Sequence, residues 1–93
     1  MIQGFADSEA ELIWSGRRSR KLPADIQNVA LRKLRLNQAR VLGDLRVPPG
    51  NRLEALRADR QGQHSIRITN QRRICFVWVE GGPSHVEIVD YHV

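Results

Sequence analysis

The stretch from residue 72 to residue 92, "RRICFVWVEGGPSHVEIVDYH", carries the clearest structural signal in the chain. Its two halves, "RRICFVWV" and "HVEIVDYH", are rich in β-branched and aromatic residues, which favour strands. Between them, residues 80–84 ("EGGPS") combine the residue types that suit a tight turn. The stretch therefore predicts a β-hairpin whose second strand runs to residue 92.

Two shorter segments before this hairpin also alternate with a period of two. They are "RLEALR" at residues 52–57 and "HSIRIT" at residues 64–69, separated from their neighbours by "ADRQGQ" and "NQ". The preceding "GDLRVPPGN", residues 43–51, holds two prolines and two glycines and is expected to be a loop. The second half of the chain thus predicts an antiparallel meander of four strands.

The first half of the chain predicts helices. "MIQGF" at residues 1–5 can form a short edge strand, and Asp7 or Ser8 can cap a helix that stops at Gly16. The basic connector that follows, residues 16–22, has little to bury and is expected to be mobile.

The clearest helix covers residues 23–42, with a break expected near Asn37. Ile26, Ala30 and Leu34 recur at a spacing of four and form an apolar stripe. Four cations lie mainly off this stripe: Arg32, Lys33, Arg35 and Arg40. They are expected to form a solvated face, with contact to an acidic partner as the alternative.

These elements predict a single domain over residues 1–93. The fold class is α+β, with N-terminal helices packed on one face of a small, mainly antiparallel sheet. A chain of 93 residues supports one modest core. No apolar run is long enough to span a membrane, and the N-terminus lacks the features of a secretory signal. The lone Cys75, in an apolar run, indicates a reduced core residue and a cytoplasmic location.

The charge of the chain is the first feature that indicates what kind of partner it binds. The net charge is +5, and 13 of the 15 basic residues are Arg, which binds phosphate in a bidentate manner. This favours a nucleic-acid partner. A genome that prefers Arg codons would give the same composition, and composition does not separate the two explanations.

The polar residues of the predicted strands supply the groups that RNA cleavage needs. A base must take the proton of the 2′-hydroxyl, an acid must protonate the leaving 5′-oxygen, and fixed cations must stabilise the phosphate. Seven arginines and only two acids lie between residues 46 and 73. Glu54 can instead be an ion-pair partner, and Arg73 can simply end a strand. Three histidines and one cysteine show no spacing typical of a metal site.

The C-terminal Asp90-Tyr91-His92 adds a geometric question. Adjacent residues of a regular strand point to opposite faces, so Tyr91 and His92 can share a site only if the strand end departs from regular geometry. Without such a departure, one of the two is structural.

The segments "PPGNRLEALRADRQGQHSIRITNQRRICFVW" and "VEIVDYH" closely resemble the HigB-type killer proteins of plasmid maintenance systems, type II toxins of the RelE/ParE superfamily. The resemblance implies a ribosome-dependent endoribonuclease that cuts mRNA on the 70S ribosome by 2′-hydroxyl attack, without metal or cofactor. It also implies a helix-turn-helix antitoxin as partner, with operator DNA bound only through the complex, and no membrane partner.

The resemblance assigns roles to individual residues. Glu54 matches the position of a general base or its orienting group, and Arg73 matches the arginine held against the scissile phosphate. The implied catalytic set is Glu54, Arg57, Arg73, Asp90, Tyr91 and His92. The expected RNA-binding set is Arg60, His64, Arg67 and Arg72, although His64 can equally be an ordinary exposed strand residue.

Three departures from the family pattern stand out. Arg57 replaces a Lys, and its pKa is too high for a proton donor. Ala58 replaces a Gly, so the turn there is expected to differ, and Arg72 replaces a Trp. Two alternative functions stay open: a ParE-like gyrase poison, and a non-catalytic basic module that binds nucleic acid or an antitoxin.

Overall fold

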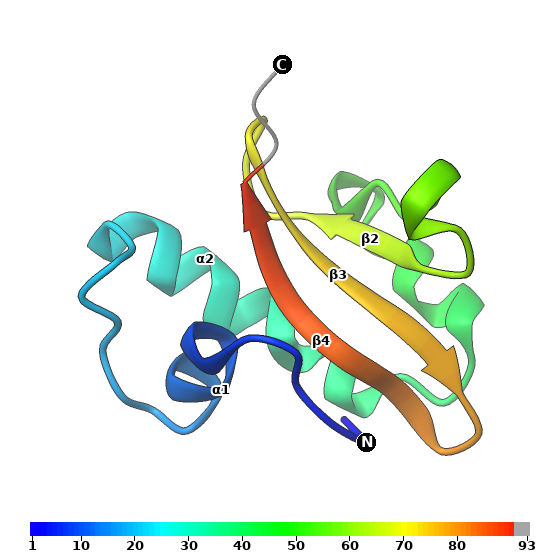
Figure 1. The fold of residues 1–93 in the computed structure, drawn as a ribbon, viewed down its shortest axis with the longest axis horizontal. Coiled ribbons are helices and arrows are strands. Elements are labelled where there is room, and N and C mark those ends of the chain that lie inside the picture. Colours follow the sequence, from blue (N-terminus) through cyan, green and yellow to red (C-terminus); the bar gives the residue numbers. More distant parts are fainter. Residues whose placement is uncertain (91–93) are drawn as a thin grey trace.

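A computed structural model describes residues 1–90, in which helices lie on one side of a four-stranded sheet (Figure 1). The strands are β1 (Glu54–Ala55), β2 (His64–Arg67), β3 (Arg72–Val79) and β4 (Gly82–Asp90). They pair in sequence order, and every neighbouring pair is antiparallel. The predicted α+β meander is confirmed.

Helix α1 (Ser8–Trp14) begins and ends where its capping residues predict. The side chain of Asp7 accepts a hydrogen bond from the backbone N–H of Glu9 at 3.0 Å, which satisfies one of the unpaired donors of the first turn. After the helix, Gly16 adopts a φ of +84°, a conformation that glycine takes without steric cost.

Helix α2 (Ala24–Lys33) continues into a 3-10 turn, η1 (Leu34–Gln38), and the chain becomes extended at Ala39. The break predicted near Asn37 is therefore confirmed. Beyond it lie two further 3-10 turns, η2 (Leu42–Arg46) and η3 (Pro49–Asn51). The prediction of an irregular loop over residues 43–51 was wrong, because a proline at the start of a 3-10 turn needs no N–H partner.

The core lies between these helical segments and the sheet. Leu34 from η1 meets Ile66, Ile74 and Phe76 from the strands, and all four are buried. Across residues 1–90, none of the helices has the length and apolar character needed to cross a membrane.

Two strand boundaries differ from their predictions. The strand predicted over residues 52–57 covers only Glu54–Ala55, because Arg52 (φ +46°) and Ala58 (φ +56°) turn the backbone on either side. The last strand begins at Gly82 instead of residue 85, and Pro83 lies within it opposite Trp78. Pro83 is tolerated there because its carbonyl faces the N-terminal segment, where it accepts a hydrogen bond from Gln3, so its missing N–H faces the same side and removes no bond to β3.

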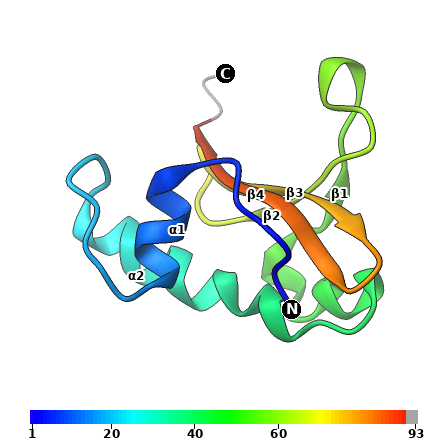
Figure 2. The ribbon, with the colours of Figure 1, turned by 60° about the horizontal axis from the view of Figure 1, so that its bottom comes forward.

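The N-terminal segment runs beside the outer edge of β4 (Figure 2). Phe5 forms a parallel bridge with Val86, whose backbone N–H and C=O bond to Gly4 and Ala6 at 3.0 and 2.9 Å. The strand predicted over residues 1–5 is thus reduced to this single bridge. The segment still covers an otherwise unpaired sheet edge.

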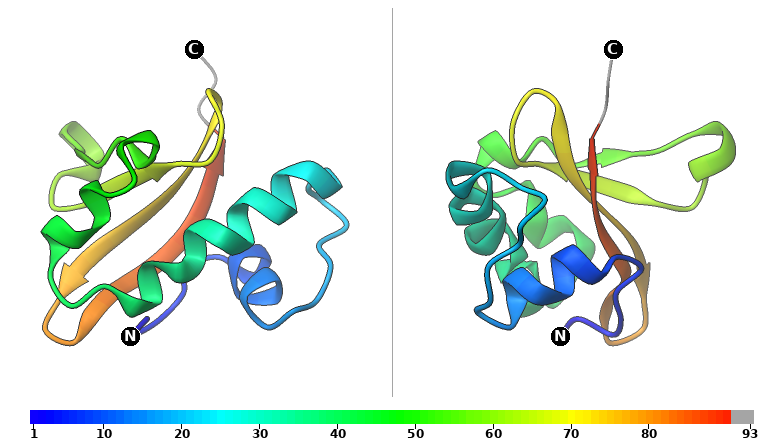
Figure 3. Two further views of the ribbon diagram at one scale, coloured as in Figure 1. Left: turned by 180° about the vertical axis from the view of Figure 1, so that it is seen from behind. Right: turned by 60° about the vertical axis from the view of Figure 1, so that its left-hand side comes forward.

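The two faces of the sheet have different roles. Ile66, Ile74 and Phe76 point toward the helices, so the residues that alternate with them point away. We call this second surface the open face. It carries Glu54, Ser65, Arg67, Arg73, Cys75 and Glu87. The loop that contains η4 (Ala58–Arg60) projects away from the helices (Figure 3, right).

Candidate functional site

One row of side chains crosses the open face from β1 to β4. The strand register places Glu54 opposite Ser65, Ser65 opposite Cys75, and Cys75 opposite Glu87. Ser65 and Cys75 are completely buried in the middle of the row, while the two carboxylates stand at its ends. The row thus has a tightly packed centre between two acids.

Two arginines oppose each other in the neighbouring row. Arg67 of β2 pairs with Arg73 of β3, and like charges directly opposite each other in a sheet are unfavourable. Arg73 Nη1 lies 3.6 Å from Glu54 Oε1, and Arg67 donates to the side-chain carbonyl of Asn70. Glu54 thus lies against one of the two opposed guanidinium groups, and two guanidinium groups side by side are suited to binding a phosphate.

Arg73 and Glu54 differ in their freedom to move. The side chain of Arg73 is 19% exposed and that of Glu54 is 54% exposed. Since packing holds the guanidinium while water surrounds the carboxylate, Glu54 can turn toward a ligand without moving the cation. This is the arrangement expected of a fixed electrostatic group beside an accessible proton acceptor.

Arg60 spans the open face. Its Nη1 lies 2.6 Å from Glu87 Oε1 on β4 and 3.1 Å from Gln63 Oε1 next to β2. Because β3 lies between these strands, the guanidinium passes across it and holds the η4 loop against the sheet. Arg60 can bind RNA, as predicted, only if a phosphate competes with Glu87.

Arg57 and Ala58 form the start of the η4 turn. Arg57 is exposed and makes no ion pair with any other part of residues 1–90. Ala58 has a φ of +56°, the left-handed conformation in which glycine is favoured. The backbone of the turn is thus of the glycine type although the residue is alanine, with a steric cost of about 1–2 kcal/mol.

Three predicted site residues lie on the helix-facing side of the sheet. Arg72 and Asp90 oppose each other across β3 and β4, with Arg72 Nη2 3.9 Å from Asp90 Oδ2. His64 stacks on Phe76, with ring centroids 6.3 Å apart, and lines a cavity of about 210 Å³ next to Leu42 and Arg46. The structure does not bring these residues together with Arg73.

Tyr91 and His92 lie outside the described residues. The expectation about which face each one takes therefore stays a prediction, and so do the functional roles of the whole predicted set. No group of His, Cys, Asp and Glu side chains within residues 1–90 is placed to hold a metal ion.

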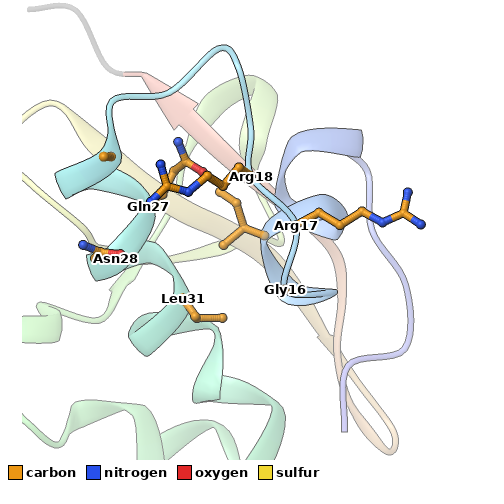
Figure 4. Close-up of a pocket in the computed structure, with 8 residues that line it drawn as sticks. Gly16, Arg17, Arg18, Gln27, Asn28 and Leu31 are labelled. Atoms are coloured by element: carbon orange, nitrogen blue, oxygen red, sulfur yellow. The ribbon is translucent and has the colours of Figure 1, made fainter.

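Sequence reasoning missed the contacts of the connector, residues 16–22. Ser19 is buried, and its backbone N–H and C=O both bond to the side chain of Gln27, at 2.8 and 2.9 Å. Close by, a cavity of about 160 Å³ lies between the connector and α2. Arg17 is one of its lining residues, and the end of its side chain extends outward (Figure 4). Apart from Ser19, the connector is mostly exposed, as its composition predicts, and its mobility stays a prediction. The contacts of Ser19 could not be predicted, because no periodic pattern marks Gln27.

Comparison with known proteins identifies the family. A model described as the RelE-like toxin of the type II toxin–antitoxin system HigB matches residues 4–92. The chain belongs to the HigB-like toxin family. A curated relative, Toxin HigB-1 of Vibrio cholerae serotype O1 (strain ATCC 39315 / El Tor Inaba N16961), is 46% identical over 83 residues, which cover 87% of each chain.

Membership of the HigB-like family confirms the expected resemblance and the RelE-like fold class. It makes the chain a toxin of a type II toxin–antitoxin system, and such a toxin has an antitoxin partner.

Proposed function

We propose that this HigB-like toxin is an endoribonuclease that cuts mRNA in the A site of the ribosome. The observation that supports this most directly is the opposed pair Arg67 and Arg73, with Glu54 3.6 Å from Arg73, on the open face. A surface with two like charges side by side gains free energy when an anion binds between them. Family membership adds the expectation that this anion belongs to RNA.

In the proposed reaction the 2′-oxygen attacks the adjacent phosphorus while the bond from phosphorus to the 5′-oxygen breaks. The Glu54 carboxylate takes the 2′-hydroxyl proton, and the products are a 2′,3′-cyclic phosphate and a 5′-hydroxyl. Arg73 stabilises the charge that develops on the phosphate oxygens, with Arg67 beside it. In this scheme, side chains of the toxin supply all the catalytic groups.

The leaving 5′-oxygen needs a proton, and for this step we propose His92 or Tyr91, as the resemblance implies. The reverse order is the alternative: His92 takes the 2′-hydroxyl proton and a protonated Glu54 donates one to the leaving 5′-oxygen. We further propose that Arg57 approaches the same phosphate from the η4 turn, where it is exposed and has no carboxylate partner within residues 1–90.

The proposed setting is the cytoplasm, with the ribosome and mRNA as targets. We propose that the antitoxin is a helix-turn-helix protein and that the toxin reaches operator DNA only as part of the complex with it.

The test is expression of Arg73→Ala in cells that lack the antitoxin. We expect the variant to fold and to lose growth arrest, with cleavage reduced roughly 10²-fold or more, because its fixed cation is gone. Mapping of mRNA 5′ ends should show new ends within codons for the unchanged toxin and none for the variant.

Arg17→Ala is the matched control, since Arg17 is exposed and its side chain extends outward beside α1. It should arrest growth as the unchanged toxin does. Growth arrest by a folded Arg73→Ala protein would refute the assignment of Arg73. Growth arrest by the unchanged toxin with intact mRNA and a DNA-damage response would indicate a gyrase target instead.

A further inference from the structure

A groove of about 470 Å³ lies between the residues of α2–η1 and those of η2–η3. These helical segments lie on the helix side of the molecule (Figure 3, left). Its basic residues come from the end of α2 and from η1, and its other wall comes from the two later turns. The groove is lined by Arg32, Lys33, Arg35, Leu36, Gln38, Ala39, Asp44, Leu45, Val47, Pro48 and Asn51. We call it the cationic groove.

The cations of the groove lack counter-ions. Arg32, Lys33 and Arg35 form no ion pair with any residue of the described chain, 1–90. Asp44 is the one acid among the lining residues, and its Oδ2 already accepts the backbone N–H groups of Arg40 and Val41 at 3.0 and 3.3 Å. The groove therefore presents three positive charges that nothing in residues 1–90 neutralises.

Lys33 shows the effect of this excess charge. Its Nζ donates to Oδ1 of Asn51 at 2.5 Å, a neutral partner that leaves the positive charge in place. Burial lowers the pKa of the Lys33 ammonium, and the nearby charges of Arg32 and Arg67 lower it further. A bound carboxylate would favour the charged ammonium and so offset both effects.

The floor and one wall of the groove are apolar. Leu36 and Leu45 are buried beneath it, while Val47 is 74% exposed at its wall. An RNA backbone would match the cations but would leave Val47 and the apolar floor without a complement. A peptide that carries carboxylates together with an apolar side chain complements the cations as well as Val47 and the apolar floor.

We propose that the cationic groove is a docking site for an acidic, amphipathic segment of the antitoxin. Carboxylates of that segment pair with Arg32, Lys33 and Arg35, and an apolar side chain covers Val47 above Leu36 and Leu45. The proposal rests on membership of a type II toxin family, and it is independent of the cleavage chemistry. The groove lies on the helix side of the sheet and the pair Glu54–Arg73 lies on the open face. Arg67 is near enough to Lys33 to affect its pKa, so the experiment changes Arg32 and Arg35 and leaves Lys33 and Arg67 in place.

The experiment reverses the charge of two exposed groove residues, Arg32→Glu with Arg35→Glu, in the full-length toxin. Binding to the purified antitoxin is measured by titration calorimetry, and rescue by the antitoxin is measured in cells. We expect roughly tenfold or greater loss of affinity, because two attractive charges become repulsive, together with failed rescue and unchanged growth arrest. The control is Arg17→Glu with Arg18→Glu, which makes the same charge change beside α1 and should bind normally.

A second variant, Val47→Ser, tests the apolar part without changing charge. Val47 is mostly exposed, so the thermal midpoint should stay the same while antitoxin affinity falls severalfold. Unchanged affinity in both groove variants would refute the proposal. Loss of growth arrest with normal antitoxin binding would also refute it, and would assign the groove to ribosomal RNA.

Discussion

Ser65 is buried at the centre of the open face, and its hydroxyl has no hydrogen-bond partner within residues 1–90. A buried polar group left unsatisfied costs about 1–3 kcal/mol. We therefore expect Ser65→Ala to raise the free energy of unfolding by about 1 kcal/mol, measured by urea denaturation. Ser84→Ala is the control and should change it little, because Ser84 is only partly buried and its hydroxyl lies 3.2 Å from His85 Nδ1.

A lower stability for Ser65→Ala would mean that the hydroxyl has a favourable interaction in solution. In that case Ser65 would have to be counted among the groups that hold the open face together.

Strand alternation predicts part of the open face and places some of the candidates on the opposite face. Arg72 and Arg73 are adjacent, so only one of them can share a face with Glu54, and the register selects Arg73. By the same rule, the side chains of His64 and Ser65 lie on opposite faces of the sheet. The bond between Arg60 and Glu87 could not be predicted, because it depends on where the η4 turn places a long side chain across two strands.

Asp7 joins two elements that are far apart in the sequence. One carboxylate oxygen accepts the N–H of Glu9 and caps α1, and the other accepts the N–H of Ile88 in β4 at 3.1 Å. Asp7→Ala removes both bonds. We expect it to lower the free energy of unfolding by roughly 2 kcal/mol, since a lost cap costs about 1 kcal/mol and a half-buried N–H without a partner costs about the same.

Asp7→Asn should lose less, because the amide oxygen can still cap the helix. Equal losses for both variants, measured by denaturant unfolding, would mean that the cap retained by Asn contributes little, and that the lost charge and the lost bond to Ile88 account for the change.

Local signals at the element scale predicted α1, α2 and the β3–β4 hairpin, because caps, periodicity and glycine turns act over a few residues. The extent of β1 could not be predicted. "RLEALR" alternates like a strand, but left-handed backbone at Arg52 and Ala58 limits the pairing to two residues. The η2 and η3 turns were missed for a similar reason, since packing of Leu45 and Asn51 stabilises turns that proline and glycine alone would not indicate.

The positive charge of the whole molecule should govern its association with RNA. We expect binding to ribosomes that carry an uncleavable 2′-deoxy mRNA mimic to weaken as salt rises, with log affinity linear in log salt concentration. Arg73→Ala should reduce this slope by about 0.7–1, since it removes one phosphate contact, and Arg17→Ala should leave it unchanged. Affinity that is independent of salt would contradict a phosphate-binding face.

The contact between the N-terminal segment and β4 also has a consequence for how the protein is made. Asp7 and its partner Ile88 are 81 positions apart, so at about 5–20 residues per second their synthesis is separated by roughly 4–16 seconds. Until β4 emerges, β3 lacks its longest neighbour and the early segment has nothing to pair with. The pairing of the N-terminal segment with β4 can therefore form only after most of residues 1–90 have been synthesised, which makes it a late contact in folding.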